Sequence, residues 1–187
     1  MKKLRSCISN QIIIDDEAID TILSVFEPIE VAKGEFLLKS GKDCRQMTFI
    51  ESGYMRMYNL VDGKEITFWM GSEGKFITSL SSFIFETNNM WSIQAVTDCN
   101  LYVISRENHF KLCKNEPKWL EFDNILLAHS FALLEKKMFS QLHTTAKQRF
   151  LNLLHEEPDL FKHVPLQYIA SMLGITPESL SRLRKIN

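Results

Sequence analysis

The sequence lacks every segment that would place the chain in or across a membrane. No apolar run approaches the roughly 20 residues that a transmembrane helix needs. The start, MKKLRSCISNQIII, is basic at first, but its apolar run is short and polar and acidic residues follow at once, unlike the core of a secretory signal peptide. These absences predict a cytoplasmic protein with no membrane partner.

The cysteines and histidines do not occur at the spacings or positions that disulfides, metal sites or catalytic sites usually need. Cys7, Cys44, Cys99 and Cys113 are far apart and form no C-x-x-C pair, which predicts reduced thiols rather than disulfides or an iron–sulfur cluster. All five histidines follow residue 108, so the strand-rich part of the chain offers none to a metal. No nucleophile elbow and no P-loop occur. We therefore expect no catalytic residue, no metal and no cofactor, and predict that the chain is not an enzyme.

The charge is nearly balanced overall but unevenly distributed. Residues 1–135 contain 14 Lys and Arg against 19 Asp and Glu, a balance of −5, whereas residues 136–187 contain 8 against 4, a balance of +4. An acidic body with a basic terminal part favours a module that binds nucleic acid at the C-terminal end.

Residues 29–105 follow the pattern of short β-strands. In YMRMYNL, Met55 and Met57 alternate with Tyr54, Arg56 and Tyr58, so the two sets must point to opposite faces of a strand. The dipeptide at 62–63, Asp-Gly, is a favoured two-residue hairpin turn. Six of the seven glycines lie in this segment, where turns need them. Many short strands with regular turns predict an antiparallel β-roll of the jelly-roll kind.

Helical patterns precede and follow this strand region. A short helix is expected from Asp15 or Asp16 to Pro28, and a long one from Pro117 to Leu142. The apolar residues of the long helix are not confined to one stripe, so two of its sides must be buried. A spacing typical of a coiled-coil seam connects Phe122, Leu126, His129 and Leu133. We interpret this seam as a homodimer interface; the alternative is a central core helix of a monomer.

The stretch VPLQYIASMLGITPESLSRLRK contains two short helical patterns separated by Gly174. Glycine can adopt the left-handed conformation that turns the chain sharply, Thr176 can cap the second helix, and Pro177 suits its first position. Neither helix is stable alone at this length, so the two must pack on each other and on a neighbour. This is the pattern of a DNA-binding helix-turn-helix.

The predicted DNA-contacting residues of this unit are Thr176, Glu178, Ser179, Arg182, Arg184 and Lys185. Arg182 can bond the O6/N7 edge of guanine, Glu178 can accept from cytosine N4, and Ser179 can take either role. The other three are better placed for phosphates, which fix the register without reading sequence. The alternative is a small helical hairpin with a solvated charged face.

Two motifs, GKFITSLSSF…WSIQAVTDCNLYVIS and IASMLGITPESLSRLRK, together with the order of elements, resemble the Crp/Fnr family of bacterial transcription regulators over nearly the full length. The resemblance implies an α+β fold with an N-terminal antiparallel β-roll, a cyclic-nucleotide-binding-type effector domain (1–116). A long dimerisation helix (117–142) and a C-terminal winged-helix or helix-turn-helix domain (143–187) follow. The implied partners are a duplex DNA operator, a second copy of the chain, RNA polymerase and a small-molecule effector.

The sequence departs from this family where a cyclic phosphate would bind. Cyclic-nucleotide binders carry a Gly-Glu pair for the ribose and an arginine for the phosphate, but the matching positions here read Thr78-Ser79 and Asn89-Met90. Because a buried phosphate without a cationic partner is costly, we expect that cAMP and cGMP do not bind. The cavity then holds another small molecule or nothing, and its predicted lining is Phe76, Thr78, Ser79, Asn89 and Trp91. The rival function is a ligand-binding regulatory module without DNA binding.

Overall fold

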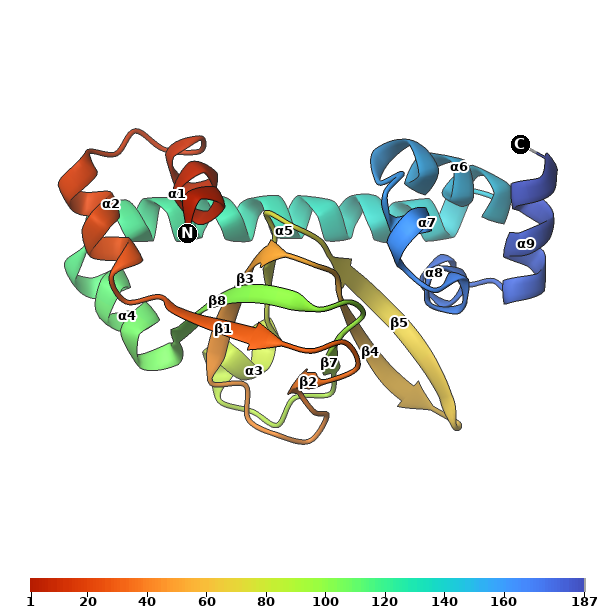
Figure 1. The fold of residues 1–187 in the computed structure, drawn as a ribbon, viewed down its shortest axis with the longest axis horizontal. Coiled ribbons are helices and arrows are strands. Elements are labelled where there is room, and N and C mark those ends of the chain that lie inside the picture. Colours follow the sequence, from red (N-terminus) through yellow and green to blue (C-terminus); the bar gives the residue numbers. More distant parts are fainter. Residues whose placement is uncertain (187) are drawn as a thin grey trace.

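The computed structural model describes residues 1–186 and shows a β-roll, a long helix across it, and small helices at both ends of that helix (Figure 1). The roll consists of two four-stranded antiparallel sheets. The first has the order β1 (Glu27–Val31), β8 (Cys99–Ser105), β3 (Gln46–Ser52) and β6 (Phe76–Ile77). The second has the order β2 (Phe36–Leu38), β7 (Ser92–Ala95), β4 (Met55–Val61) and β5 (Lys64–Gly71). The predicted antiparallel β-roll is confirmed.

The turn between β4 and β5 forms as its sequence predicts. Asp62 has a φ of 51° and Gly63 a φ of 75°, and positive φ at both central residues is the signature of a type I′ hairpin turn. The two strands pair in register from Val61 with Lys64 at the turn to Met55 with Gly71 at the far end, with a bulge after Met57.

The alternation in β4 is also confirmed, but both of its faces are buried. Met55 and Met57 point into the roll, whereas Arg56 and Tyr58 point outward and are nevertheless nearly inaccessible to water. Outward-facing strand residues are normally solvated. Here the C-terminal helices cover them, which the strand pattern alone could not reveal.

The long helix α5 (Pro117–His143) begins at the predicted proline and ends one residue beyond the predicted boundary. Its first turns form a core with three further helices: α1 (Lys2–Ser9), α2 (Asp16–Leu23) and α4 (Arg106–Asn115). Phe122 is fully buried in this core, so it has no surface to offer a second chain, contrary to the predicted dimer seam.

Within residues 1–186, no helix is both long and apolar enough to cross a bilayer.

The C-terminal part is helical throughout its described length. It contains α6 (Ala146–Glu156), α7 (Leu160–His163), α8 (Leu166–Leu173) and α9 (Pro177–Ile186). Gly174 sits between α8 and α9 with a φ of 69°, which supplies the predicted left-handed turn. Residues 143–186 form no strand.

The helix-turn-helix docks against the outer face of the roll through β4 and β5. The Arg56 guanidinium lies between two tyrosine rings, 4.0 Å from the ring centre of Tyr58 and 3.7 Å from that of Tyr168 on α8. The Ser171 hydroxyl on α8 donates to the Glu65 carbonyl and accepts from the Thr67 amide of β5. Because β5 is an edge strand, these bonds satisfy backbone groups that would otherwise be exposed for pairing.

Arg56→Met is expected to lower the free energy of unfolding by about 2–3 kcal/mol, because the buried guanidinium donates charged hydrogen bonds to Gln94 and Glu65 and such bonds are worth about 1.5–3 kcal/mol. Arg45→Met is the matched control, since Arg45 also pairs with an acid but is 83% exposed, and it should cost less than about 1 kcal/mol. Urea denaturation of both variants measures the difference. Equal losses would mean that the stacked Arg56 contributes no more than a surface ion pair.

Candidate functional site

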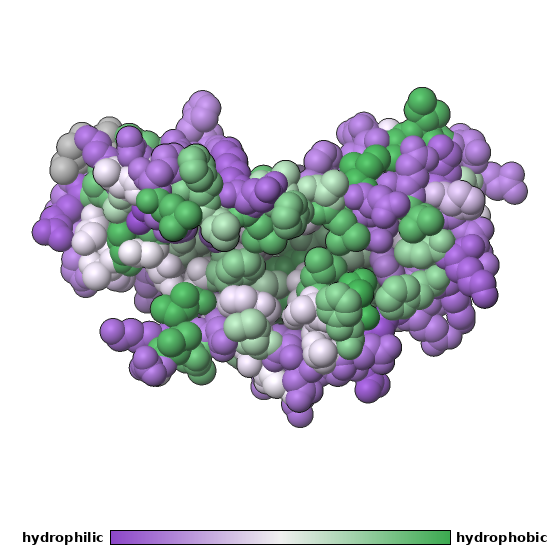
Figure 2. Space-filling model, turned by 180° about the vertical axis from the view of Figure 1, so that it is seen from behind, coloured by the Kyte–Doolittle hydropathy of each residue, from purple (hydrophilic) through white to green (hydrophobic). Residues whose placement is uncertain are grey.

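A cavity of about 280 Å³ lies between the roll and the middle of α5, bounded also by the short helix α3 (Leu80–Phe85). Hydrophobic side chains gather around a hollow on this side of the molecule, where α5 crosses the roll (Figure 2). One wall is aromatic, with Phe68 stacked on Trp91 at 4.7 Å between ring centres. The α5 wall is formed by Asp123, Leu126, Leu127, Ser130, Leu133 and Leu134.

Four of the five predicted cavity residues line this space: Phe76, Thr78, Ser79 and Trp91. The fifth, Asn89, does not. Its buried amide donates to the carbonyls of Lys39 and Lys42, and its side-chain oxygen accepts from the Trp91 amide. Asn89 therefore holds the loop between α3 and β7 to the loop before β3, a structural role that replaces the predicted ligand contact.

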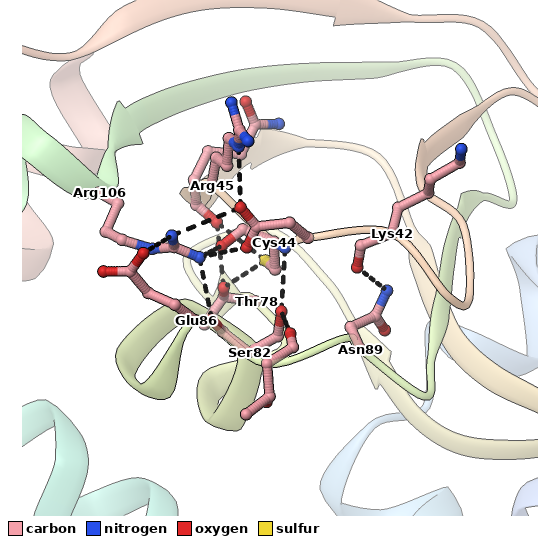
Figure 3. Close-up of polar contacts among 11 residues, drawn as sticks. Lys42, Cys44, Arg45, Thr78, Ser82, Glu86, Asn89 and Arg106 are labelled. Atoms are coloured by element: carbon pink, nitrogen blue, oxygen red, sulfur yellow. Dashed lines mark hydrogen bonds and ion pairs between the residues drawn. The ribbon is translucent and has the colours of Figure 1, made fainter.

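Polar contacts hold the segment between β6 and β7, which contains α3, against the loop before β3 (Figure 3). Arg106 from the start of α4 donates to the carbonyls of Cys44 and Ser82 at 2.7 and 2.9 Å and pairs with Asp43. The Ser82 hydroxyl accepts from the Cys44 amide. Arg106 thus holds α3 against the loop before β3. It is not among the residues that line the cavity.

The charges of the cavity lining are unfavourable for a bound phosphate. Among the described residues that line it, none is Lys or Arg, and the titratable ones are His109 and Asp123. Burial lowers the pKa of His109 to about 4 and raises the pKa of Asp123 to about 6. The buried Ser79 hydroxyl has no hydrogen-bond partner within residues 1–186. The cavity therefore offers an apolar, aromatic surface with a few neutral or acidic polar groups.

Sequence reasoning missed the polar cluster at the edge of this cavity. His109 and Cys113 of α4 face Asp123 of α5, with His109 Nε2 3.6 Å from the Cys113 thiol and 3.8 Å from Asp123 Oδ2. Burial raises the pKa of Cys113 to about 11, with the negative charge of Asp123 adding to the effect. The available signals were the four-residue spacing of His109 and Cys113, which places them on one helix face, and a carboxylate within the apolar run of α5.

A second cavity, of about 320 Å³, lies between α5, β5 and the C-terminal helices. Its lining contains four basic residues, but each is engaged by the protein itself. Lys136 pairs with Glu156, Lys75 pairs with Glu157, and Arg149 donates to the carbonyls of Leu173 and Thr144. Lys137 donates to the Phe68 carbonyl, and burial lowers its pKa to about 8. These contacts link the roll, α5 and the helix-turn-helix into one body.

The residues predicted to contact DNA are Thr176, directly before α9, and five residues of α9 itself. Leu180 is fully buried in the cluster that also contains Ile169 and Ala170 of α8, which orients the opposite face outward. The Thr176 hydroxyl accepts from the Ser179 amide at 3.2 Å, and Arg182 donates to the Ser179 hydroxyl. Ser179 is half-buried, and the exposed members of the set are Thr176, Glu178, Arg182, Arg184 and Lys185.

The exposed stripe of α5 differs from the predicted seam. Leu126 and Leu133 face the first cavity, and His129 is exposed beside them. The exposed large apolar residues of α5 also include Leu133 and Phe139, and the three that form a stripe are Phe131, Met138 and Leu142, at 65%, 68% and 78% exposed. Their separations of seven and four residues place them on one side of the helix.

Comparisons with known proteins agree with this architecture. Residues 28–116 match the family model of the cyclic nucleotide-binding domain. The c-di-GMP responsive global regulator CLP of Xanthomonas campestris is similar in structure, with 18% identity, 92% of this chain and 91% of that chain covered, and a TM-score of 0.71. FixK2 from Bradyrhizobium japonicum has 17% identity over 87% and 84% of the two chains, with a TM-score of 0.75.

A Crp/Fnr-family transcriptional regulator from Eubacterium rectale has 21% identity over 92% of this chain and 83% of that chain, with a TM-score of 0.71. No protein among those with curated descriptions matches the sequence. At these identities the structural likeness shows the fold, and the activity has to be argued from the residues of this chain.

Proposed function

We propose that the chain is a homodimeric transcription regulator that binds duplex DNA sequence-specifically. Residues 28–116 match the cyclic nucleotide-binding domain, and the fold is similar to that of Crp/Fnr regulators. The observation that carries this proposal is the outward face of α9. Packing of Leu180 against α8 holds the helix rigidly, while three basic side chains and one carboxylate of the same helix remain exposed. A recognition helix needs both properties.

The residues of α9 divide into two roles. Arg182 and Glu178 are exposed on its first turns and can reach base edges, with Arg182 suited to guanine and Glu178 to cytosine. Ser179 lies beside them and its hydroxyl already contacts Arg182, so it positions the guanidinium or reads a base itself. Thr176, Arg184 and Lys185 are suited to phosphates.

The rival function is a ligand-binding regulatory module that does not bind DNA. Such a module would keep the roll, the cavity and α5, but it would need no exposed Arg182 and Glu178 on a helix fixed by Leu180. RNA polymerase would be a further partner of a DNA-bound activator. A selection of duplex DNA separates the regulator from the rival module.

Selection of random duplexes by the purified protein is expected to recover a palindrome with half-sites about one helical turn apart. On that site, Arg182→Ala should cost about 1–3 kcal/mol and relax the preference at one base pair in each half-site. Lys147→Ala, an exposed basic residue of α6, is the control and should retain the full preference. Quantitative binding over a range of salt concentrations measures both. Unchanged selectivity in Arg182→Ala would refute the base-reading role.

The second copy of the chain is proposed to pack along the outward stripe of α5. The spacing of a coiled-coil seam connects Phe131, Met138 and Leu142, and their side chains are 65%, 68% and 78% exposed. Two such helices packed together would cover these residues and the open side of the neighbouring cavity. They would also place the two α9 helices symmetrically, at the spacing of about 34 Å that adjacent major grooves require.

Phe131→Asp is expected to convert the dimer to a monomer. A two-fold interface contains the substitution twice, and losing about 1.5 kcal/mol of apolar burial at each phenylalanine weakens dimerisation by at least about 100-fold. Leu60→Asp is the matched control, because Leu60 is 63% exposed at the far end of β4, and it should stay dimeric. Sedimentation velocity of the three proteins gives the answer. A parent protein that is monomeric at all concentrations would contradict the seam.

The cavity between the roll and α5 is the proposed effector site, and its lining favours an uncharged, largely apolar or aromatic molecule. Since α5 forms one wall, a ligand that prefers one position of α5 would shift the population of DNA-binding conformations. The same lining disfavours a cyclic phosphate, because no described cationic side chain points into it and Arg106 is held by Asp43 and backbone carbonyls.

Titration with cAMP or cGMP to millimolar concentrations is therefore expected to produce no heat of binding and no increase in the melting temperature. Isothermal calorimetry and thermal unfolding of the full-length protein measure these quantities. A dissociation constant in the micromolar range would contradict this prediction. It would mean that a group outside this lining neutralises the phosphate and that the protein does respond to cyclic nucleotides.

A further inference from the structure

We propose that His109, Cys113 and Asp123 form a binding site for a divalent zinc-type cation at the junction of α4 and α5, with its fourth coordination position open to the effector cavity. The three side chains come from two helices that meet at the floor of the cavity. This proposal concerns ligand atoms on α4 and α5 and does not depend on whether α9 binds DNA.

The distances in the cluster are close to those of a tetrahedral zinc site. His109 Nε2 is 3.6 Å from the Cys113 sulfur and 3.8 Å from Asp123 Oδ2, and all three ligand atoms lie within 4.8 Å of one another. A tetrahedral ion with Zn–N of about 2.0 Å and Zn–S of about 2.3 Å separates its nitrogen and sulfur ligands by about 3.5 Å. The nitrogen and sulfur are thus already in place, and a small rotation of the carboxylate completes the triad.

The ligand set selects the class of metal. One imidazole nitrogen, one thiolate and one carboxylate oxygen suit a borderline-soft ion such as Zn²⁺, Co²⁺ or Fe²⁺, whereas Mg²⁺ and Ca²⁺ prefer oxygen alone. The His109 ring is also held in a fixed orientation, edge-on to Phe83 at 5.1 Å and to Trp119 at 5.8 Å between ring centres. A ligand held rigidly by its surroundings loses little freedom on binding.

Charge balance provides an independent argument. Asp123 is buried, and within residues 1–186 its side chain makes no hydrogen bond and has no Lys or Arg partner. An unpaired buried carboxylate is costly. His109 does not act as such a partner, because its Nε2 is 3.8 Å from Asp123 Oδ2, which is too far for a hydrogen bond. A divalent cation balances one thiolate and one carboxylate, which leaves the buried cluster neutral.

The geometry of the cavity determines the fourth position. His109 and Asp123 line the cavity, and Cys113 does not, so an ion held by the three would face the cavity between the first two. Three protein ligands with one open position is the arrangement of zinc sites that bind water or a ligand, not that of closed structural sites. The open position would accept an oxygen, nitrogen or sulfur donor of a small molecule whose remaining surface is apolar.

Titration of the metal-free, reduced full-length protein with Co²⁺ tests the site. One Co²⁺ per chain should bind with a near-ultraviolet charge-transfer band from the thiolate, Zn²⁺ should abolish that band, and Zn²⁺ should raise the melting temperature. Mg²⁺ should do neither. If the parent shows no charge-transfer band and no Zn²⁺-dependent rise in melting temperature, the cluster is a buried polar group of the fold and the proposal fails.

Matched cysteine variants identify the ligand. Cys113→Ser should remove the band and weaken Co²⁺ binding by more than about 100-fold, beyond the 10–100-fold of second-shell losses. Cys7→Ser is the control, since Cys7 is also half-buried but lies on α1 beside the Gly74 carbonyl, and it should bind as the parent does. Asp123→Asn should keep the thiolate band with weaker affinity. A band that survives in Cys113→Ser would place the metal elsewhere and overturn the assignment.

Discussion

The rest of the structure depends on one helix that is apolar on more than one side. At 27 residues, α5 is about 40 Å long, and each third of it meets a different neighbour (Figure 1). The first third is buried among the N-terminal helices and α4, the middle forms a wall of the first cavity, and the last third contacts the second cavity and leads into the C-terminal helices. A change in the position of α5 would therefore alter its contacts at all three places.

Two arginines, the buried Arg56 and the half-buried Arg106, hold separate elements of the structure together. Arg56 stacks between Tyr58 and Tyr168 and so attaches α8 to the outer face of the roll, while Arg106 fastens the segment after β6 to the loop before β3. All three guanidinium nitrogens of Arg56 donate hydrogen bonds within the protein, and both terminal nitrogens of Arg106 do so. Both arginines thus hold elements together, and no Lys or Arg is among the described residues that line the first cavity.

The contacts that connect the roll to the helix-turn-helix are polar as well as apolar. Ser171 satisfies the edge of β5, Tyr54 stacks on His163, and Lys137 reaches from α5 to the Phe68 carbonyl beside the aromatic wall of the cavity. Such directional contacts favour discrete positions over gradual movement. These contacts run from the cavity wall through α5 and β5 to α8, and regulation of DNA binding by a ligand would need such a connection.

The sequence by itself determined the local elements. Asp62-Gly63 specified its hairpin, Pro117 began the long helix, and Gly174 with Leu180 specified the helix-turn-helix, because turn chemistry and apolar spacing act over a few residues. The tertiary structure alone decided which faces were buried. It placed Phe122 in the core and made Asn89 hold two loops together. It also covered Arg56 with Tyr168 and brought Asp123 close to His109 and Cys113. These outcomes depend on contacts between residues distant in the chain, and no local pattern encodes which of two apolar faces meets which neighbour.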